Sequence, residues 1–150
     1  MPASRAPPKA SSGPRKALGK ADYLRLAQFR HRLRRFLRAS ESLCHASGAT
    51  PLQYQLLLQV KGASAERDWS TIGELAEQLQ SKHHGVVALV DRCVEMGLVE
   101  RRPGRDDRRT VEVHLLAKGE RLLERLALLH RSEVALLKRE FELPGWADAD

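Results

Sequence analysis

The sequence lacks several features, and each absence excludes a class of protein. It has only two cysteines, Cys44 and Cys93, which is too few for a disulfide-stapled secreted scaffold. No apolar run approaches the roughly 18 residues that a transmembrane helix needs. The basic residues near the N-terminus are followed by no apolar stretch, so they do not resemble a secretory signal peptide. We therefore expect a single-domain cytoplasmic protein that has no membrane partner.

The residue patterns of catalysis and metal binding are also missing. There is no nucleophile elbow, phosphate-binding loop, zinc-protease motif or evident pair of catalytic carboxylates. His83 and His84 are adjacent, so a helix would point them to different sides, and no histidine pair has the spacing of a zinc site. We expect no enzyme activity, no cofactor and no metal. Cys93 is expected to be a core thiol, whereas Cys44, beside His45, is expected to be partly exposed.

Acidic residues are absent from the first 20 positions, which hold five basic side chains among Pro, Gly, Ala and Ser. We expect residues 1–20 to be a disordered basic tail. The other 130 residues hold 21 basic and 19 acidic side chains, so their overall charge is nearly balanced. They contain two arginine clusters, at 25–38 and 101–109. Such clusters suit a polyanion such as nucleic acid, but solvated helix faces have the same composition.

Hydrophobic periodicity predicts a mainly α-helical chain. Thr50-Pro51-Leu52-Gln53 and Thr71-Ile72-Gly73-Glu74 have the pattern of capping boxes, which begin helices. Gly62 and Gly97 follow periodic segments and are expected to end helices. The predicted helices are Asp22 to about His45, 51–61, Ile72–Leu79, about Lys82 to Met96, and Ala117 to about Phe141.

The two short helices, Ile72–Leu79 and Lys82–Met96, are joined only by Gln80 and Ser81, which is typical of a helix-turn-helix. Residues Leu98–Arg102 and Thr110–Leu115 are predicted to be the strands of a β-hairpin, with Val111, Val113 and Leu115 on one face. A hairpin directly after a helix-turn-helix is a wing. The predicted fold is therefore a mainly α winged helix-turn-helix with a small β-hairpin wing and two long terminal helices.

Five short motifs of this region resemble the MarR family of bacterial transcription regulators. They are Glu74-Leu75-Ala76, Leu89-Val90-Asp91-Arg92, Gly97-Leu98-Val99-Glu100-Arg101-Arg102, Asp106-Asp107-Arg108-Arg109 and Leu116-Ala117-Lys118-Gly119. The resemblance covers about residues 22–141. It implies a dimer that represses or activates genes, often in response to small phenolic or oxidising molecules.

The second helix of a helix-turn-helix enters the major groove and uses its N-terminal side chains to contact bases and phosphates. The family commonly has a small hydroxyl residue at the position of Val87 and an arginine at that of Ala88. Direct base reading is therefore expected to be weaker here, or to shift to the histidine pair. The expected DNA-binding residues lie at the start of this helix and in the wing: Ser81, Lys82, His83, His84, Val87, Ala88, Arg92, Arg105, Asp107, Arg108 and Arg109.

An arginine at a hairpin tip can enter a narrow minor groove, where the potential is most negative. Asp107 and Arg109 match an Asp-x-Arg pair of the MarR family, in which the acid holds the arginine. We expect the Asp107 carboxylate to fix the fork of Arg109 by two hydrogen bonds. The alternative is a turn ion pair with no ligand.

The resemblance also implies how the chain is organised. Residues 21–150 would form one MarR-like domain, in which the first and last helices form the dimer lobe and about 50–116 the DNA-binding lobe. A pocket for a small aromatic effector is expected near Phe36, His45 and Tyr54. The expected function is a ligand-responsive repressor, located at the nucleoid, that binds a pseudo-palindromic DNA operator as a homodimer. The alternative is a winged-helix module that binds protein or RNA without operator recognition.

Overall fold

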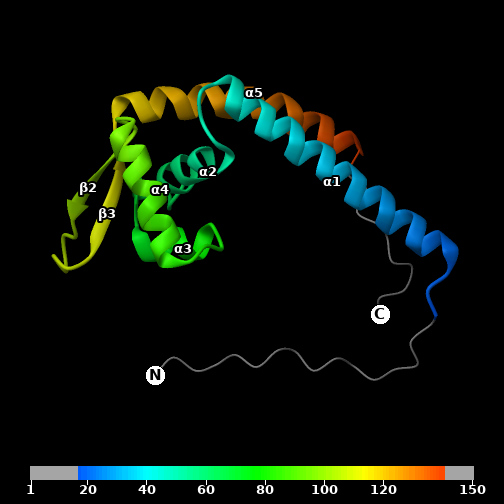
Figure 1. Cartoon of the computed structure of the whole chain (residues 1–150), viewed down its shortest axis with the longest axis horizontal. Helices are drawn as coiled ribbons and strands as arrows, with labels where there is room; N and C mark the ends of the chain where they lie inside the picture. The colour runs from blue at the N-terminus through cyan, green and yellow to red at the C-terminus, as the bar shows by residue number, and fades with distance from the viewer. Residues whose placement is uncertain (1–16, 141–150) are drawn as a thin grey trace.

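The computed structural model describes residues 17–140, so the predictions for 1–16 and for the chain after 140 lie outside the described residues. Two long helices lie side by side above a winged body that contains the other elements (Figure 1). The elements in chain order are α1 (Lys20–Ala46), α2 (Pro51–Lys61), β1 (Trp69–Thr71), α3 (Ile72–Gln78), α4 (His83–Glu95), β2 (Val99–Pro103), β3 (Val111–Leu115) and α5 (Ala117–Glu140). The first helix was predicted from Asp22, but it begins at Lys20, which is the last residue of the expected tail. Within 17–140, no helix has the length and apolar composition of a membrane span.

Both predicted capping boxes are present. The Thr50 hydroxyl accepts a hydrogen bond from the backbone N–H of Gln53 at 3.2 Å, and the Gln53 side chain accepts one from Thr50 at 2.9 Å. Thr71 and Glu74 make the same two bonds at the start of α3. The guanidinium of Arg67 bonds to Glu74 and holds the pKa of that carboxyl below its ordinary value. These reciprocal bonds satisfy backbone donors that a helix start leaves unpaired, so both helices begin where the sequence predicts.

The turns around α4 depend on left-handed backbone. Gly97, which follows α4, has φ of 70°, as its predicted role at a helix end requires. Gln80, between α3 and α4, has φ of 50° although it is not a glycine. Left-handed residues thus lie in the turns at both ends of α4.

The predicted hairpin is part of a larger sheet. A third strand, β1, pairs with β3, and the antiparallel strands have the order β1-β3-β2. Both edges of β3 are paired because this strand is central, and both of its faces are buried, as Val113 on one face and Glu112 and His114 on the other show. The prediction of a two-stranded hairpin was therefore incomplete. A three-residue strand is too short to show a period-two pattern, which is why β1 was missed.

The core gathers around α2, where Leu56, Leu57 and Val60 are fully buried. Helical spacing places Val86, Leu89, Val90 and Cys93 on one face, the inward row of α4. All four are buried, as is Leu98 just after the helix, and Cys93 is a core thiol as predicted. The prediction for Cys44 was wrong, because this thiol is also fully buried. The last turn of α1 packs against α2 and α5, which removes Cys44 from solvent.

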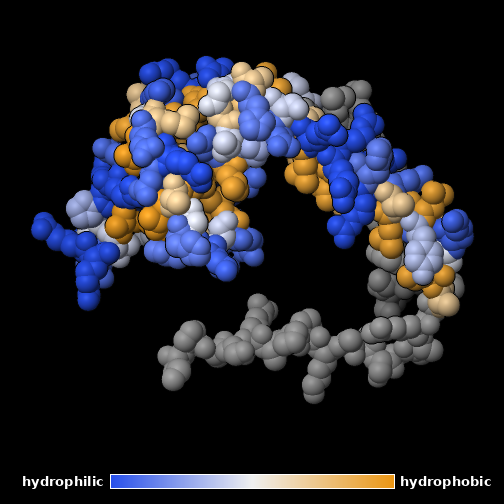
Figure 2. Space-filling view, viewed as in Figure 1, coloured by the Kyte–Doolittle hydropathy of each residue, from blue (hydrophilic) through white to orange (hydrophobic). Residues whose placement is uncertain are grey.

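The long helices differ along their length. The first half of α5 buries Leu122, Leu123 and Leu126 against the winged body. Farther along α5 and over much of α1, large apolar side chains remain exposed: Tyr23, Leu24, Leu37, Leu128, Leu129 and Val134. Apolar patches are accordingly visible along α1, whereas the wing is hydrophilic (Figure 2). The side chain of Leu137 lies outside what the structure describes.

Candidate nucleic-acid interface

The start of α4 presents a polar surface. Lys82, which precedes the helix, and His83 and His84 in its first turn are all exposed. No side chain caps this helix start. The backbone N–H groups at a helix N-terminus carry a partial positive charge, and together with Lys82 they suit a phosphate group.

The other residues predicted on this helix differ in exposure. Ala88 and Arg92 are exposed, as predicted. Val87 is half-buried and packs against the core, so only part of it can meet a ligand. Ser81 is also half-buried, and its hydroxyl donates to the carbonyl of Leu79 at 3.3 Å. Ser81 therefore stabilises the turn between the two helices in this structure.

Two arginines of the second cluster are neutralised by neighbouring acids. Arg101 reaches from β2 to α4, where it bonds to the Asp91 carboxylate at 2.5 Å and to the carbonyl of Val87 at 3.3 Å. Arg102 bonds to Glu100, two residues away on the same strand. Both arginines belong to the basic cluster that the sequence analysis identifies at 101–109. Their ion pairs leave the wing residues Arg105, Arg108 and Arg109 as the cluster's most exposed cations.

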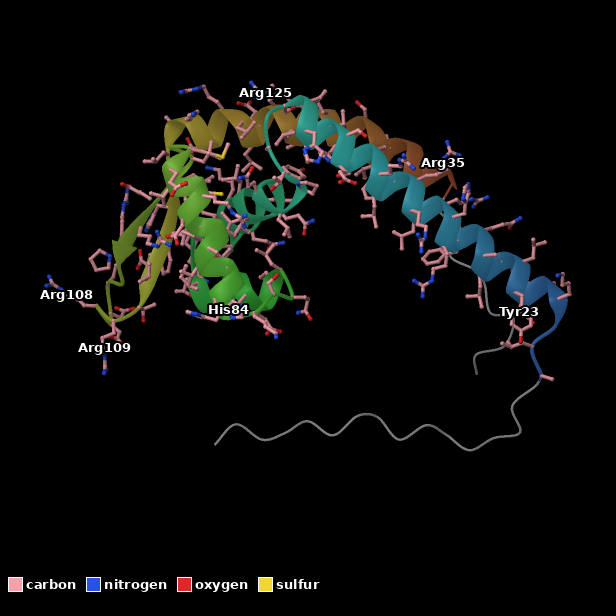
Figure 3. The ribbon with its side chains drawn as sticks, viewed as in Figure 1. Tyr23, Arg35, His84, Arg108, Arg109 and Arg125 are labelled. Carbon is pink, nitrogen blue, oxygen red and sulfur yellow. The ribbon has the colours of Figure 1, made fainter. Side chains whose placement is uncertain are left out.

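The wing tip carries the predicted Asp107–Arg109 contact in a different form. One oxygen of Asp107 accepts both the backbone N–H of Arg109 at 3.0 Å and its Nε–H at 3.4 Å. A carboxylate two residues before an N–H commonly forms such a turn, so the predicted two-bond fork was wrong. The Arg109 side chain is 93% exposed. Asp107 thus holds the Nε end of the Arg109 side chain, and the outer end of Arg109 points away from the wing (Figure 3).

The wing loop closes tightly at its base. Gly104 is buried, its N–H donates to the carbonyl of Thr110 at 2.8 Å, and Thr110 donates to the carbonyl of Asp107 at 3.0 Å. A Cβ atom at position 104 would lie 2.4 Å from the Asp107 carbonyl oxygen. Only glycine fits there without moving the backbone, so the loop has a defined path.

These two surfaces lie on one side of the molecule. His84, at the start of α4, and Arg108 and Arg109, at the wing tip, occupy the same lower edge, away from α1 and α5 (Figure 3). We call Lys82, His83, His84, Arg108 and Arg109 the α4–wing edge. The structure thus brings together predicted residues from two segments that are separated by 24 positions in the chain, 84 to 108.

The three residues of the expected effector pocket differ in their exposure and contacts. His45 is exposed and lies 3.7 Å from Glu41 on its own helix. Tyr54 is buried, which raises the pKa of its hydroxyl, and its ring stacks on His130 at 4.4 Å. The ring of His130 thus covers one face of the Tyr54 ring. Phe36 is half-buried on α1.

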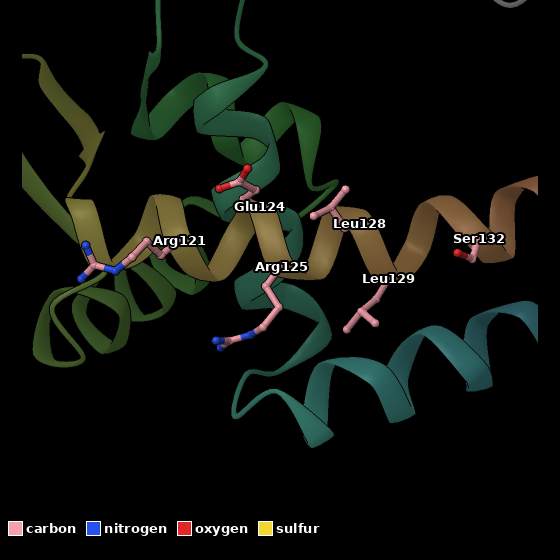
Figure 4. Close-up of a pocket in the computed structure, with 6 residues that line it drawn as sticks. All are labelled: Arg121, Glu124, Arg125, Leu128, Leu129 and Ser132. Carbon is pink, nitrogen blue, oxygen red and sulfur yellow. The ribbon is translucent and has the colours of Figure 1, made fainter.

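The grooves that the structure describes near α5 are lined by other residues. One follows the outer face of α5 alone (Figure 4), with the lining residues Arg121, Glu124, Arg125, Leu128, Leu129 and Ser132. A second lies between α2 and α5, beside Leu58 and Lys61. Neither includes the expected pocket residues. Among residues 17–140, no group of three or more His, Cys, Asp or Glu side chains is arranged to hold a metal ion.

Sequence reasoning missed the residues that support the wing. Neither Glu112 nor His114 was predicted to support the wing. Both are buried, and the ring of Trp69, in the unpredicted strand β1, stacks on His114. The alternation of apolar and polar residues in β3 correctly marks two faces, but it does not tell whether the polar face is covered.

Comparisons with known proteins match this arrangement. The sequence profile of the MarR family matches residues 47–110, which contain α2, the helix-turn-helix and most of the wing. Among solved structures, AbsC, a MarR family transcriptional regulator from Streptomyces coelicolor, is similar with a TM-score of 0.69 and 20% identity, over 85% of this chain and 82% of that one. A search of curated proteins by sequence gives no significant match.

Three of the similar structures contain DNA, among them a mutant of MepR from S. aureus that is bound to an oligodeoxyribonucleotide. Another is a cysteine-to-serine mutant of MarR from E. coli in complex with operator DNA, with a TM-score of 0.59 and 25% identity, over 72% of this chain and 75% of that one. The third is the M. tuberculosis transcriptional regulator MosR in complex with DNA, with a TM-score of 0.60 and 23% identity, over 78% and 82%. The described part of the chain thus has the fold of these regulators.

Proposed function

We propose that this chain, whose residues 47–110 belong to the MarR family, is a transcription regulator that binds double-stranded DNA in a sequence-specific way. The observation that carries the proposal is the α4–wing edge. It sets an uncapped helix start with exposed polar side chains beside an exposed arginine tip. A major groove and its neighbouring minor groove accept these two shapes respectively.

In this proposal, the start of α4 reads the major groove. Lys82 contacts a phosphate or a guanine, and the rings of His83 and His84 donate hydrogen bonds to acceptors on base edges. Arg92, Ala88 and the accessible part of Val87 extend the contact along the helix. The inward row of α4 is fixed in the core, so the outward side chains have a defined orientation.

The wing reads the minor groove. Arg109 enters it, and Arg105 and Arg108 lie near the phosphates of its walls. Minor-groove acceptors distinguish A·T from G·C pairs but not the order of the two bases, so Arg109 senses mainly groove width. The contact of Asp107 with Nε and the backbone leaves the outer nitrogens of the guanidinium for DNA.

We further propose that the protein acts as a homodimer on a pseudo-palindromic operator. The exposed apolar side chains of α1 and α5 support this, because a second copy would remove them from water. Two-fold symmetry would then place two α4 helices in successive major grooves, roughly 34–36 Å apart. Occupation of a promoter by such a dimer would make it a repressor.

A small aromatic effector is also part of the proposal, near the expected residues Phe36, His45 and Tyr54. It would enter where α1, α2 and α5 meet and take the place of the His130 ring on Tyr54. Displacement of His130 would break its hydrogen bond to Ser40 of α1, which is 2.6 Å long. Binding would thus change the contact between the long helices and the winged body.

The test is selection of bound sequences from a random duplex pool by the full chain, repeated with His84→Ala. We expect a two-fold symmetric site, and a loss of preference at one position of each half-site with a cost of about 1–3 kcal/mol. Glu95→Ala, in the last turn of the same helix, is the matched control and should leave the site unchanged. Absence of any enriched duplex, with binding to a structured RNA or a protein retained, would favour the interaction module instead.

A further inference from the structure

The outer face of the sheet holds a buried pair of titratable residues that DNA contact does not explain. Strand register places Glu112 opposite Arg102 and Thr71, and His114 opposite Glu100 and Trp69. Directly opposed residues share a face of an antiparallel sheet. Glu112 is only 3% exposed and His114 only 8%. A buried carboxylate requires hydrogen-bond partners, so its contacts show what it holds in place.

The Glu112 carboxylate joins the sheet to the wing loop. Its Oε2 accepts a hydrogen bond from Nε2 of His114 at 2.8 Å. Its Oε1 accepts the backbone N–H of Arg105 at 3.2 Å, and the Arg105 guanidinium lies 4.0 Å from Oε2. Arg105 is the residue after Gly104, where the loop leaves β2. One buried side chain therefore fixes the loop at its first turn.

The surrounding groups determine the protonation form of His114. A carboxylate only accepts, so Nε2 must carry the hydrogen that faces Glu112. Nδ1 lies 3.5 Å from Nη1 of Arg102, and a guanidinium only donates, so Nδ1 must accept. These two contacts favour the tautomer of His114 that has its hydrogen on Nε2. Arg102 is paired in turn with Glu100. The contacts thus run from Glu100 through Arg102, His114 and Glu112 to Arg105.

Trp69 covers this chain from the solvent side. Its ring stacks on His114 with 6.0 Å between centroids and an interplanar angle of 25°. The guanidinium of Arg67 lies 4.4 Å from the ring centroid, and that of Arg105 lies 5.6 Å from it. Arg105 is thus restrained by both Glu112 and an aromatic face, while Arg109 is left outside.

We propose that Glu112, oriented by His114, is a positioning residue of the wing, which fixes the loop at Arg105 and thereby sets where Arg108 and Arg109 meet DNA. The inference rests on the proposed function but adds a site that touches no DNA itself. The hydrogen bonds from His114 and from the backbone of Arg105 hold the pKa of Glu112 below its ordinary value. The carboxylate is consequently charged at neutral pH and accepts the hydrogen bond from the backbone N–H of Arg105.

The first arm of the test measures duplex affinity at fixed salt for Glu112→Gln. We expect roughly a tenfold loss on operators with A·T-rich flanks and a smaller loss on G·C-rich flanks, as for a lost minor-groove contact. In an Arg109→Ala background the same change should have little further effect, because both act on one contact. Glu95→Gln is the control, since that carboxylate is exposed in the last turn of α4 and belongs to none of these contacts. It should stay within about twofold of the wild type.

The second arm needs no DNA. Nitrogen-15 spectra of the wild-type His114 ring should show hydrogen on Nε2 and an unprotonated Nδ1 at neutral pH. In Glu112→Gln the amide can face Nε2 with a donor, so the hydrogen should move to Nδ1 or the contact with Arg102 should be lost. The amide of Arg105 should also exchange its hydrogen several-fold faster. A merely structural role would lower stability without altering flank preference.

The outcomes separate the two proposals. No duplex binding by the wild type would overturn the proposed function and, with it, this role of Glu112. Duplex binding that Glu112→Gln leaves unchanged, or losses from Glu112→Gln and Arg109→Ala that simply add, would overturn the positioning role alone. A wild-type His114 ring with its hydrogen on Nδ1 would also overturn the positioning role.

Discussion

The α4–wing edge exposes its charged side chains, whereas the junction of α1, α2 and α5 buries its polar groups and satisfies them. Arg109 is 93% exposed, and its side chain contacts only Asp107 among the hydrogen bonds of the described residues. His130 is 6% exposed and bonds through Nε2 to Ser40 at 2.6 Å and through Nδ1 to the Leu126 carbonyl at 2.8 Å. We call Ser40, Tyr54 and His130 the helix junction.

This difference separates the residues that would bind from the residues that hold the binding surface in place. An exposed side chain contributes little to the free energy of folding, so its replacement should change ligand affinity alone. A buried side chain of the helix junction or the core contributes to folding, so its replacement should change stability first. Glu112 connects the two classes, because it is buried but bonds to the wing loop.

Core substitution beneath the helix junction should have the largest effect. Leu57 of α2 is fully buried, and Leu57→Ala should lower the free energy of unfolding by about 2–5 kcal/mol through lost burial and a cavity. Leu52, on the same helix, is 46% exposed, and Leu52→Ala should cost much less. Urea denaturation of both variants measures the difference. Equal losses would mean that α2 does not lie at the centre of the core.

Substitution at the α4–wing edge should alter binding without altering stability. Arg109→Ala should weaken duplex binding by about 1–3 kcal/mol, most strongly on A·T-rich flanks, and leave the unfolding transition within about 0.5 kcal/mol. Asp107→Ala should give a milder loss of the same kind, because it frees the guanidinium without removing its charge. Arg125→Ala is the control, since Arg125 lies on the opposite side of the molecule from His84 (Figure 3). Equal losses for Arg109→Ala and Arg125→Ala would indicate a nonspecific charge effect.

Much of the fold could be predicted because short-range physics determines it. The caps at Thr50 and Thr71 depend on residues three positions apart, and the inward row of α4 follows from helical spacing. The wing was visible because its strands flank a turn with Pro and Gly. The residues of the α4–wing edge could be named for the same reason, since they are the outward positions of elements that the pattern already located.

The rest depended on contacts between distant segments. The strand that contains Trp69 has three residues, and its pairing with His114 spans 45 positions, 69 to 114. Burial of Cys44 and stacking of His130 on Tyr54 depend on how α1 and α5 cross the body. No local pattern encodes such crossings. The buried polar groups, rather than the exposed ones, were therefore the residues that sequence reasoning misjudged.

A single hydrogen bond of the helix junction should have a moderate effect on stability. Because Nδ1 of His130 donates to Leu126, Nε2 accepts from the Ser40 hydroxyl, and Ser40→Ala leaves that acceptor unpaired. We expect a loss of about 1–3 kcal/mol in the free energy of unfolding, with unchanged operator preference. Ser42→Ala is the matched control on α1, because its hydroxyl is exposed and bonds only to the nearby carbonyl of Arg38. Similar losses for both would mean that the bond between Ser40 and His130 contributes nothing beyond helix propensity.

The smallest effect should come from the buried thiol of α4. Burial raises the pKa of Cys93 to about 11, from an ordinary value of 9.0. The folded state therefore holds a neutral thiol at a pH where the unfolded chain already loses the proton. Its contribution to stability is fully present below pH 9.0 and is lost as the pH rises toward about 11.

Tyr54 and Lys61 also titrate at alkaline pH, so the wild type is compared with a variant that lacks only the Cys93 thiol. The free energy of unfolding of the wild type and of Cys93→Ala is followed from pH 8 to pH 11 by urea denaturation. Cys93→Ala should be less stable near neutral pH because it leaves a small cavity, and its stability should fall less steeply above pH 9.0. Thiol reagents should label the native protein far more slowly than the unfolded chain, since Cys44 and Cys93 are both buried. Parallel pH curves, or rapid labelling of the native fold, would show that α4 opens to solvent, and the contrast between a rigid interior and an exposed α4–wing edge would then fail.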